Sequence, residues 1–301
     1  MERISFKHSV IFFNFCILIS PFYFIVNFEL IIFCLFLILI LGISHGALDN
    51  IKGKKLFKIF GYKSSVYFYL AYLFISVLIV ASWLCFPNTV LFIFLVVASY
   101  HFGKEDTVFS FKRKFLISEF LFFLKGSSVI LMPLLLKKAE TIEIFRILNF
   151  NVFELSIFTD HFLIVTLFLS FLSSLYISQK KNANLIGIMV MDFFSLFILN
   201  FFLTPVLAFT LYFCFLHSIR HSIKLIFELD KSIKSGLRKF ISRAIPLTLV
   251  TGVIFLLAIF FLNNFYKLDE AIYKVIFIGL ASLTFPHILL EYLLEKNEKR
   301  T

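Results

Sequence analysis

Long, uninterrupted apolar runs constrain this chain more than any other feature of its sequence. Residues 10–27 and 66–84, for example, contain no Asp, Glu, Lys or Arg. Runs of about 18 or more apolar residues cross a membrane as helices, whereas the strands of membrane barrels alternate over about ten residues. Only 16% of the residues are charged, against about one-quarter in soluble domains. The sequence therefore predicts an all-α, polytopic integral membrane protein and excludes a soluble globular domain.

Apolar runs and polar breaks predict about ten transmembrane helices, with a range of 8–10. The chain has no soluble domain, long linker or internal repeat, so we expect a single integral-membrane domain over residues 1–301. The first run has no small-residue cleavage site and is interpreted as a membrane helix. The expected spans are 10–27, 30–48, 66–84, 88–103, 115–136, 156–177, 184–203, 205–224, 241–262 and 272–290.

The distribution of Lys and Arg predicts the orientation, because short cytoplasmic loops carry the positive excess. Most of the 29 basic residues fall on one side of the expected topology, the side that also holds both ends of the chain. We therefore expect a protein of the cell (inner, cytoplasmic) membrane with both termini in the cytoplasm. The net charge of +11 follows from this topology and from attraction to anionic lipid. No nucleic-acid-binding motif is present, so no nucleic-acid partner is expected.

Five of the seven histidines lie near the expected cytoplasmic ends of different helices. A single histidine inside the membrane commonly forms a hydrogen bond to a neighbouring helix. Ionisable groups are energetically costly in the membrane, so several of them at one depth indicate a functional site. Imidazole is a ligand for Fe, Zn, Cu or Ni, so the layer predicts a metal site. His8, in the expected cytoplasmic tail, and His161, on the opposite face, are expected to take no part. The five are His45, His101, His217, His221 and His287.

Spacing strengthens the metal interpretation. His217 and His221 are four residues apart, so they project from one face of a helix. A carboxylate follows each of the other three histidines by four residues and is a candidate for orienting an imidazole. These carboxylates are Asp49, Glu105 and Glu291.

Two further ionisable residues, Lys125 and Asp192, fall within expected spans. They are expected to pair inside the bundle if they face one another, and a structural role is favoured over a functional one.

Four motifs together resemble one known family. They are GISHGALD at 42–49, SYHFGKED at 99–106, HSIRH at 217–221 and FPH at 285–287. In this order and on these helix ends, they are similar to the motifs of the bacterial and archaeal Brp/Blh (bacteriorhodopsin-related-protein-like) family of β-carotene 15,15'-dioxygenases. The resemblance covers residues 42–287. One departure is Ser44, where the family usually has Pro before the first histidine.

The resemblance implies a site and a reaction. It implies a mononuclear Fe(2+) bound by His45, His101, His217 and His221, with two positions open on a six-coordinate ion. It implies that dioxygen cleaves the central double bond of β-carotene to give two molecules of all-trans-retinal, with no separate protein acid or base. β-Carotene, dioxygen and membrane lipid are the implied partners, with a microbial rhodopsin as a possible retinal acceptor. Candidates for orienting the ligands or facing the substrate are His287, Asp49, Glu105, Asp106, Arg220 and Glu291.

Several alternatives remain open on the sequence. Another histidine-ligated membrane oxygenase, with a different carotenoid or lipid substrate, fits the same histidines. A di-iron desaturase fits less well, since the chain has no HxxHH box. A transporter with a polar pathway through Lys125 and Asp192 is disfavoured because inverted repeats are lacking. A rhodopsin with retinal on Lys125 does not fit ten spans.

Overall fold

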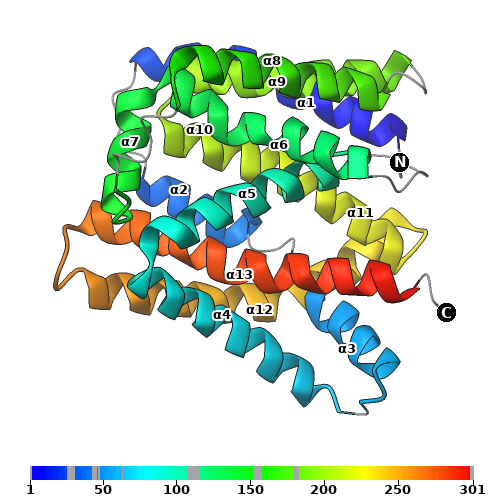
Figure 1. Ribbon diagram of the computed structural model, residues 1–301. Helices are drawn as coiled ribbons and strands as arrows, with labels where there is room; N and C mark the ends of the chain where they lie inside the picture. Colours follow the sequence, from blue (N-terminus) through cyan, green and yellow to red (C-terminus); the bar gives the residue numbers. More distant parts are fainter. Residues whose placement is uncertain are drawn as a thin grey trace. The chain divides into compact units, whose positions relative to one another are not determined.

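The structure, a computed structural model, is helical throughout the part of the chain that it describes. Described are residues 2–25, 31–42, 46, 48–62, 64–107, 116–151, 158–178 and 183–298. The helices form two compact units, which divide within α5 (Pro87–Glu105) and α11 (Ile219–Leu229) (Figure 1). Unit 1 contains residues 1–38 and 95–224, and unit 2 contains residues 39–94 and 225–301. The expectation of one integral-membrane domain stays a prediction.

Unit 1 is built around α6 (Leu116–Leu136), which contacts both α8 (Asp160–Ser178) and α9 (Ala183–Phe202). Helix α9 also packs along α1 (Glu2–Ile19). The unit further contains α7 (Lys138–Ile147), α10 (Pro205–Leu211) and the short helices η1 (Ser20–Ile25) and α2 (Ile31–Leu37). After α10 the chain continues as a π-helical segment, η5 (Tyr212–Ser218), which leads directly into α11.

Helices α5 and α6 approach closely through two glycines. A Cβ atom on Gly126 would lie 1.8 Å from the backbone oxygen of Ser99, and one on Gly103 would lie 1.7 Å from that of Phe122. Small residues at the interface allow the backbones of two membrane helices to approach closely. The contact fixes the end of α5, which carries the SYHFGKED motif.

Unit 2 is organised by α13 (Leu268–Glu298), which contacts α3 (Asp49–Ile59), α4 (Val66–Cys85) and α12 (Ile233–Leu262) (Figure 1). Leu56, Phe68, Leu290 and Leu294 form the apolar cluster that joins α3, α4 and α13. The outer surface of α4, and that of α12 from Ile245 onward, is exposed and largely apolar, as helices that face lipid require.

Eight described helices are long and apolar enough to cross a membrane, so the chain is a multi-pass membrane protein. They correspond to eight of the ten expected spans, but the count of ten is not confirmed. The expected span 30–48 is represented in the described residues by a helical stretch from Ile31 to Gly42, which at 1.5 Å per residue is shorter than the ~30 Å hydrocarbon core. The expected span 88–103 lies in α5, whose polar end lowers its hydropathy. The eight are Glu2–Phe22, Val66–Cys85, Ile117–Leu136, Asp160–Ser178, Ala183–Phe202, Pro205–Leu229, Ile233–Leu262 and Leu268–Asn297.

Candidate metal centre

Three of the predicted histidines gather in unit 1. His101 lies on α5, His217 in the π-helical segment η5, and His221 near the beginning of α11. All three side chains are buried. The rings of His101 and His217 lie edge to face with their centroids 5.2 Å apart. Residues 116 positions apart in the sequence are thus brought into direct contact.

Two consecutive carboxylates at the end of α5 hold two of these imidazoles. Nδ1 of His217 lies 2.8 Å from Oδ1 of Asp106, and Nδ1 of His221 lies 3.1 Å from Oε2 of Glu105. An ionised carboxylate only accepts hydrogen bonds, so each Nδ1 is the donor. In a neutral imidazole Nε2 then carries the lone pair, which is the arrangement of metal-ligating histidines in proteins.

Asp106 is itself held on several sides. Tyr212 donates from its hydroxyl to Oδ2 of Asp106 at 2.5 Å, and Arg220 donates to the backbone oxygen of Asp106 at 3.3 Å. Burial opposes ionisation of Asp106, but the neighbouring His217, Lys125 and Arg220 outweigh it and hold the pKa of this carboxyl below its ordinary value. These neighbours favour the ionised form of Asp106, which is an acceptor of hydrogen bonds.

Glu105 is held in the same way. Lys224 donates to Oε2 of Glu105 at 3.3 Å, the same oxygen that accepts from His221. Burial raises the pKa of the Glu105 carboxyl, but His221 and Lys224 more than reverse this and hold it well below its usual value. Both carboxylates of the GKED motif are thus fixed acceptors for imidazoles.

The buried arginine of the HSIRH motif forms an ion pair. Arg220 donates to both carboxylate oxygens of Asp192, at 2.6 and 3.0 Å, and to Oγ of Ser9 at 2.8 Å. Asp192 therefore pairs with Arg220, not with Lys125 as expected. Offsets along the chain cannot show which neighbouring helix faces a residue, so this partner could not be read from the sequence. Lys125 instead donates to the backbone oxygen of Gly103 at 3.4 Å.

Lys125, Asp106, Asp192 and Tyr212 line a small cavity in unit 1. The two carboxylates balance the charges of Lys125 and Arg220, so this polar interior is neutral when His217 is neutral. A balanced set of charges is the form in which ionisable groups are tolerated inside a membrane protein.

The π-helical segment gives His217 an unusual setting. Such segments are rare and frequently occur at functional sites. Nε2 of His8 donates to the backbone oxygen of Phe215, within this segment, at 2.8 Å. The expectation that His8 lies in a tail was wrong, because α1 is helical from Glu2 and packs inside unit 1. The expectation that His8 takes no part in the histidine cluster stays a prediction.

Aromatic rings cover the imidazole of His217. The ring of Phe102 meets it edge to face at 4.9 Å, and the ring of Phe213 lies nearly parallel to it at 5.8 Å. These rings exclude water from one side of the histidine cluster and make that side apolar.

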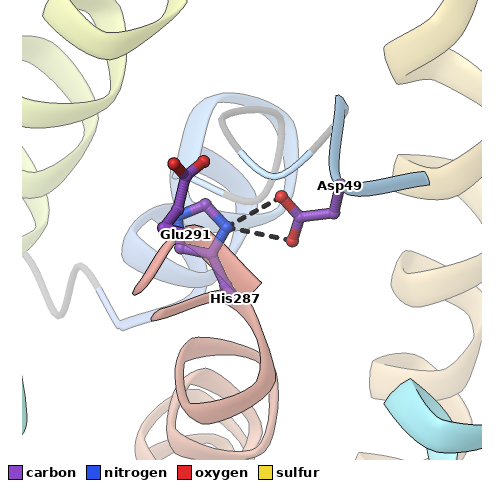
Figure 2. Close-up of side chains that lie close together, drawn as sticks. All are labelled: Asp49, His287 and Glu291. Atoms are coloured by element: carbon purple, nitrogen blue, oxygen red, sulfur yellow. Dashed lines mark hydrogen bonds and ion pairs between the residues drawn. The ribbon is translucent and has the colours of Figure 1, made fainter. Parts of the chain in front are cut away.

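A second cluster lies in unit 2, where Asp49, His287 and Glu291 offer ligand atoms within 4.8 Å of one another (Figure 2). Nδ1 of His287 faces both carboxylate oxygens of Asp49, at 2.8 and 2.9 Å. Tyr72 donates to Oδ2 of Asp49 at 3.1 Å. Lys52 forms an ion pair with Glu291 at 2.5 Å. Burial disfavours the charged form of Lys52, but Glu291 outweighs this and raises the pKa of the ammonium.

The structure thus places the predicted residues in two groups. His101, Glu105, Asp106, His217, Arg220 and His221 lie together in unit 1, and Asp49, His287 and Glu291 lie together in unit 2. His45 lies outside the described residues. The carboxylates hold imidazoles of other segments: Glu105 holds His221, and Asp49 holds His287.

Comparison with known proteins assigns the chain. The family model described as β-carotene 15,15'-dioxygenase matches residues 36–295. The chain belongs to this family. A β-carotene 15,15'-dioxygenase from the uncultured marine bacterium 66A03 is 29% identical over 272 residues, which cover 88% of this chain and 94% of that protein. No solved protein structure matches the chain.

The buried imidazoles of this member of the β-carotene 15,15'-dioxygenase family can serve as ligands for a divalent transition metal. Buried imidazoles with carboxylates at Nδ1 are suitable ligands for iron. Sequence reasoning did not find three hydroxyl groups that donate to buried carboxylates: Tyr212 donates to Asp106, Ser9 to Asp192 and Tyr72 to Asp49. Tyr212 lies five residues before His217, about one turn of a π-helix. This spacing is the feature of the sequence that could have placed Tyr212 on the same helix face as His217.

Proposed function

We propose that this chain cleaves β-carotene at its central 15,15' double bond with dioxygen and releases two molecules of all-trans-retinal. The match of the family model to residues 36–295 carries this proposal. The name of the relative from the uncultured marine bacterium supports it. A membrane setting also suits this substrate, because β-carotene dissolves in the hydrocarbon core and could enter the protein sideways from the lipid.

The metal in this proposal is a single ferrous iron held by His45, His101, His217 and His221. The buried imidazoles of unit 1 and their bonds to Asp106 and Glu105 support the assignment of His217 and His221. The contact between the rings of His101 and His217 supports that of His101. When bound, ferrous iron would supply the redox chemistry that lets dioxygen react with a polyene double bond.

The chain's own residues orient the ligands and exclude water. Asp106 and Glu105 fix the tautomer and the rotation of two imidazoles, so that their Nε2 atoms stay available to a metal. Phe102 and Phe213 shield His217, which keeps water from the reacting dioxygen. No residue of the cluster is assigned as a separate acid or base.

The remaining partners follow from the same proposal. Dioxygen is the second substrate, membrane lipid is the medium, and a retinal-binding microbial rhodopsin is a suitable acceptor of the product. The excess of Lys and Arg on one side of the expected topology supports the proposal that the protein lies in the cell membrane with both termini in the cytoplasm.

The experiment is expression of the chain in a bacterium that accumulates β-carotene, with chromatographic analysis of the extracted pigments. Loss of carotene with two retinal molecules for each carotene lost is expected. The variant His101→Ala abolishes cleavage and lowers iron content, whereas the matched change His161→Ala, on the exposed end of α8, leaves both unchanged. Longer apocarotenals would assign a different cleavage position or carotenoid. Intact carotene beside a well-expressed, iron-loaded protein would refute the proposal.

A further inference from the structure

Helix α12, in unit 2, is longer than the hydrocarbon core that it crosses (Figure 1). It has 30 residues, which at 1.5 Å per residue span about 45 Å, against about 30 Å for the core. Residues 245–262 include no Asp, Glu, Lys or Arg and span about 27 Å, close to the thickness of the core. Residues 233–243 therefore lie at the level of the lipid headgroups or beyond them.

These first turns of α12 are basic. Residues 231–243 include five Lys and Arg residues and no Asp or Glu. Lys239 forms an ion pair with Asp230 at 2.6 Å. The other four basic side chains are exposed and have no carboxylate partner within the described part of the chain, so their charge is available to a ligand. They are Lys231, Lys234, Arg238 and Arg243.

An exposed apolar row runs along the whole of α12. Residues four positions apart lie one above the other on a helix. Every fourth residue from Ile233 to Phe261 is apolar, with 42% to 64% of its surface exposed. The row thus begins among the basic turns and continues without a break along the part of α12 that crosses the membrane. Its members are Ile233, Leu237, Ile241, Ile245, Leu249, Val253, Leu257 and Phe261.

A second row lies directly beside the apolar row, one residue further along the chain. It begins with Lys234, Arg238 and Ser242, all of them exposed, and is apolar from Pro246 onward. Residues at this spacing have Cβ atoms about 5–6 Å apart, so the three polar side chains can reach one ligand. The planar guanidinium of an arginine makes two parallel bonds to a phosphate, and an ammonium and a hydroxyl add further donors. The second row therefore offers phosphate-binding groups beside an apolar surface.

The opposite face of these turns is buried, which fixes the direction of both rows. Phe240 and Ala244 pack with Leu225 of α11. A Cβ atom on Gly236 would lie 2.4 Å from the backbone oxygen of Ile226, so the backbones of α11 and α12 are in close contact. A ligand that binds to the exposed face therefore meets a surface whose backbone is already ordered, which lowers the entropic cost of binding.

We propose that the first turns of α12 bind an anionic phospholipid, whose phosphate is held by Lys234, Arg238 and Ser242 and whose acyl chains lie along the apolar row. Position favours this occupant over an acidic protein, because the apolar row continues into the span that lies in lipid. Clusters of four or more Lys and Arg next to a membrane-spanning helix are typical of binding to anionic lipids. The proposal assigns one site to the general attraction that the net charge predicts. It is independent of iron and of carotene cleavage.

Native mass spectrometry of the purified full chain in detergent tests this site. The protein is titrated with phosphatidylglycerol and, separately, with phosphatidylcholine that has the same acyl chains. We expect at least one phosphatidylglycerol to stay bound under conditions that remove phosphatidylcholine. Lys234→Gln combined with Arg238→Gln should weaken phosphatidylglycerol binding by about 10- to 30-fold, the combined effect of two basic residues near an anionic lipid.

Lys54→Gln combined with Lys58→Gln is the matched control. These two lysines are also exposed and four residues apart, but α3 ends at Ile59 and is not continuous with a membrane-spanning helix. The control loses the same charge and should bind phosphatidylglycerol like the wild type. Ser242→Glu adds a negative charge to the second row and should also weaken binding, so it tests the site if the double variant does not fold. Phosphatidylglycerol with six-carbon acyl chains should bind more weakly, because it covers less of the apolar row.

Equal losses in the two double variants would show only a general attraction between net positive charge and anionic lipid, and would overturn the proposal. Equal retention of phosphatidylglycerol and phosphatidylcholine would overturn it as well. A dimer that is seen in the same spectra and is lost in the Lys234→Gln and Arg238→Gln variant would assign this surface to a second copy of the chain instead. Unchanged lipid binding in that variant and in Ser242→Glu would leave an acidic partner protein as the better interpretation.

Discussion

Replacing Asp106 with Asn removes one negative charge from the buried interior of unit 1 and keeps the size of the side chain. In the wild-type protein Asp106 and Asp192 balance Lys125 and Arg220, so Asp106→Asn leaves one positive charge uncompensated. Removing one partner of a buried ion pair costs about 3–5 kcal/mol of the free energy of unfolding. The lost charged hydrogen bond to His217 is part of this cost, not an addition to it.

The same substitution affects the metal centre by a separate route. An amide offers one oxygen acceptor, whereas the carboxylate of Asp106 accepts from both His217 and Tyr212. The tautomer and the rotation of His217 are then no longer fixed. We expect ferrous iron to bind about 10- to 100-fold more weakly, which corresponds to about 1.4–2.7 kcal/mol.

A double variant separates the two effects. Asp106→Asn with Lys125→Met restores the charge balance, because Asp192 and Arg220 still pair. The double variant should recover much of the thermal stability in detergent but keep the weakened iron binding. Equal stability of the single variant and the wild type, or wild-type iron affinity in either variant, would refute the reasoning.

Three further predictions concern the helix contacts and the topology. Gly126→Ala should lower the free energy of unfolding by about 1–3 kcal/mol or more, because its Cβ would lie 1.8 Å from the backbone oxygen of Ser99. The control Gly252→Ala, where a Cβ would have nothing within 4 Å, should be neutral or stabilise by up to about 1 kcal/mol. Equal losses in the two variants would contradict the close helix contact. Arg220→Lys should cost about 1.5–3 kcal/mol of the free energy of unfolding, because an ammonium lacks the planar fork of N–H donors that makes two parallel bonds to Asp192. Unchanged unfolding would show that the two-point bond contributes nothing. A fluorescent protein fused to the C-terminus should fluoresce and a fused periplasmic phosphatase should be inactive; the reverse pair of results would invert the predicted orientation.

The sequence was a good guide to most membrane spans, because long apolar runs have few solutions other than helices. The two expected spans that are not confirmed are segments that are apolar but short or that end in polar residues. The segment Ile31–Gly42 and helix α5 are the two examples. Hydropathy measures the fit of a segment to lipid, and it does not report contacts between helices such as the close approach of α5 and α6.

The residues of the candidate site were also identifiable in the sequence, but their partners were not. Spacing by four residues predicts that His101 and Glu105 share one face of a helix, and it cannot show what lies opposite that face. In the structure Glu105 faces His221, and Asp192 faces Arg220. These pairings depend on which helices pack together, a property of the whole unit.

Once the pairings are known, the spacing within the motifs has a physical explanation. Glu105 and Asp106 are consecutive at the end of α5, so their side chains diverge and can reach imidazoles one turn apart on the continuous helical segment formed by η5 and α11. Asp106 takes His217, and Glu105 takes His221. Arg220, between these histidines, turns to Asp192 and to the backbone of Asp106. The SYHFGKED and HSIRH motifs therefore act together. Arg220 bonds the HSIRH segment to the end of α5, and Glu105 and Asp106 orient the imidazoles of His221 and His217.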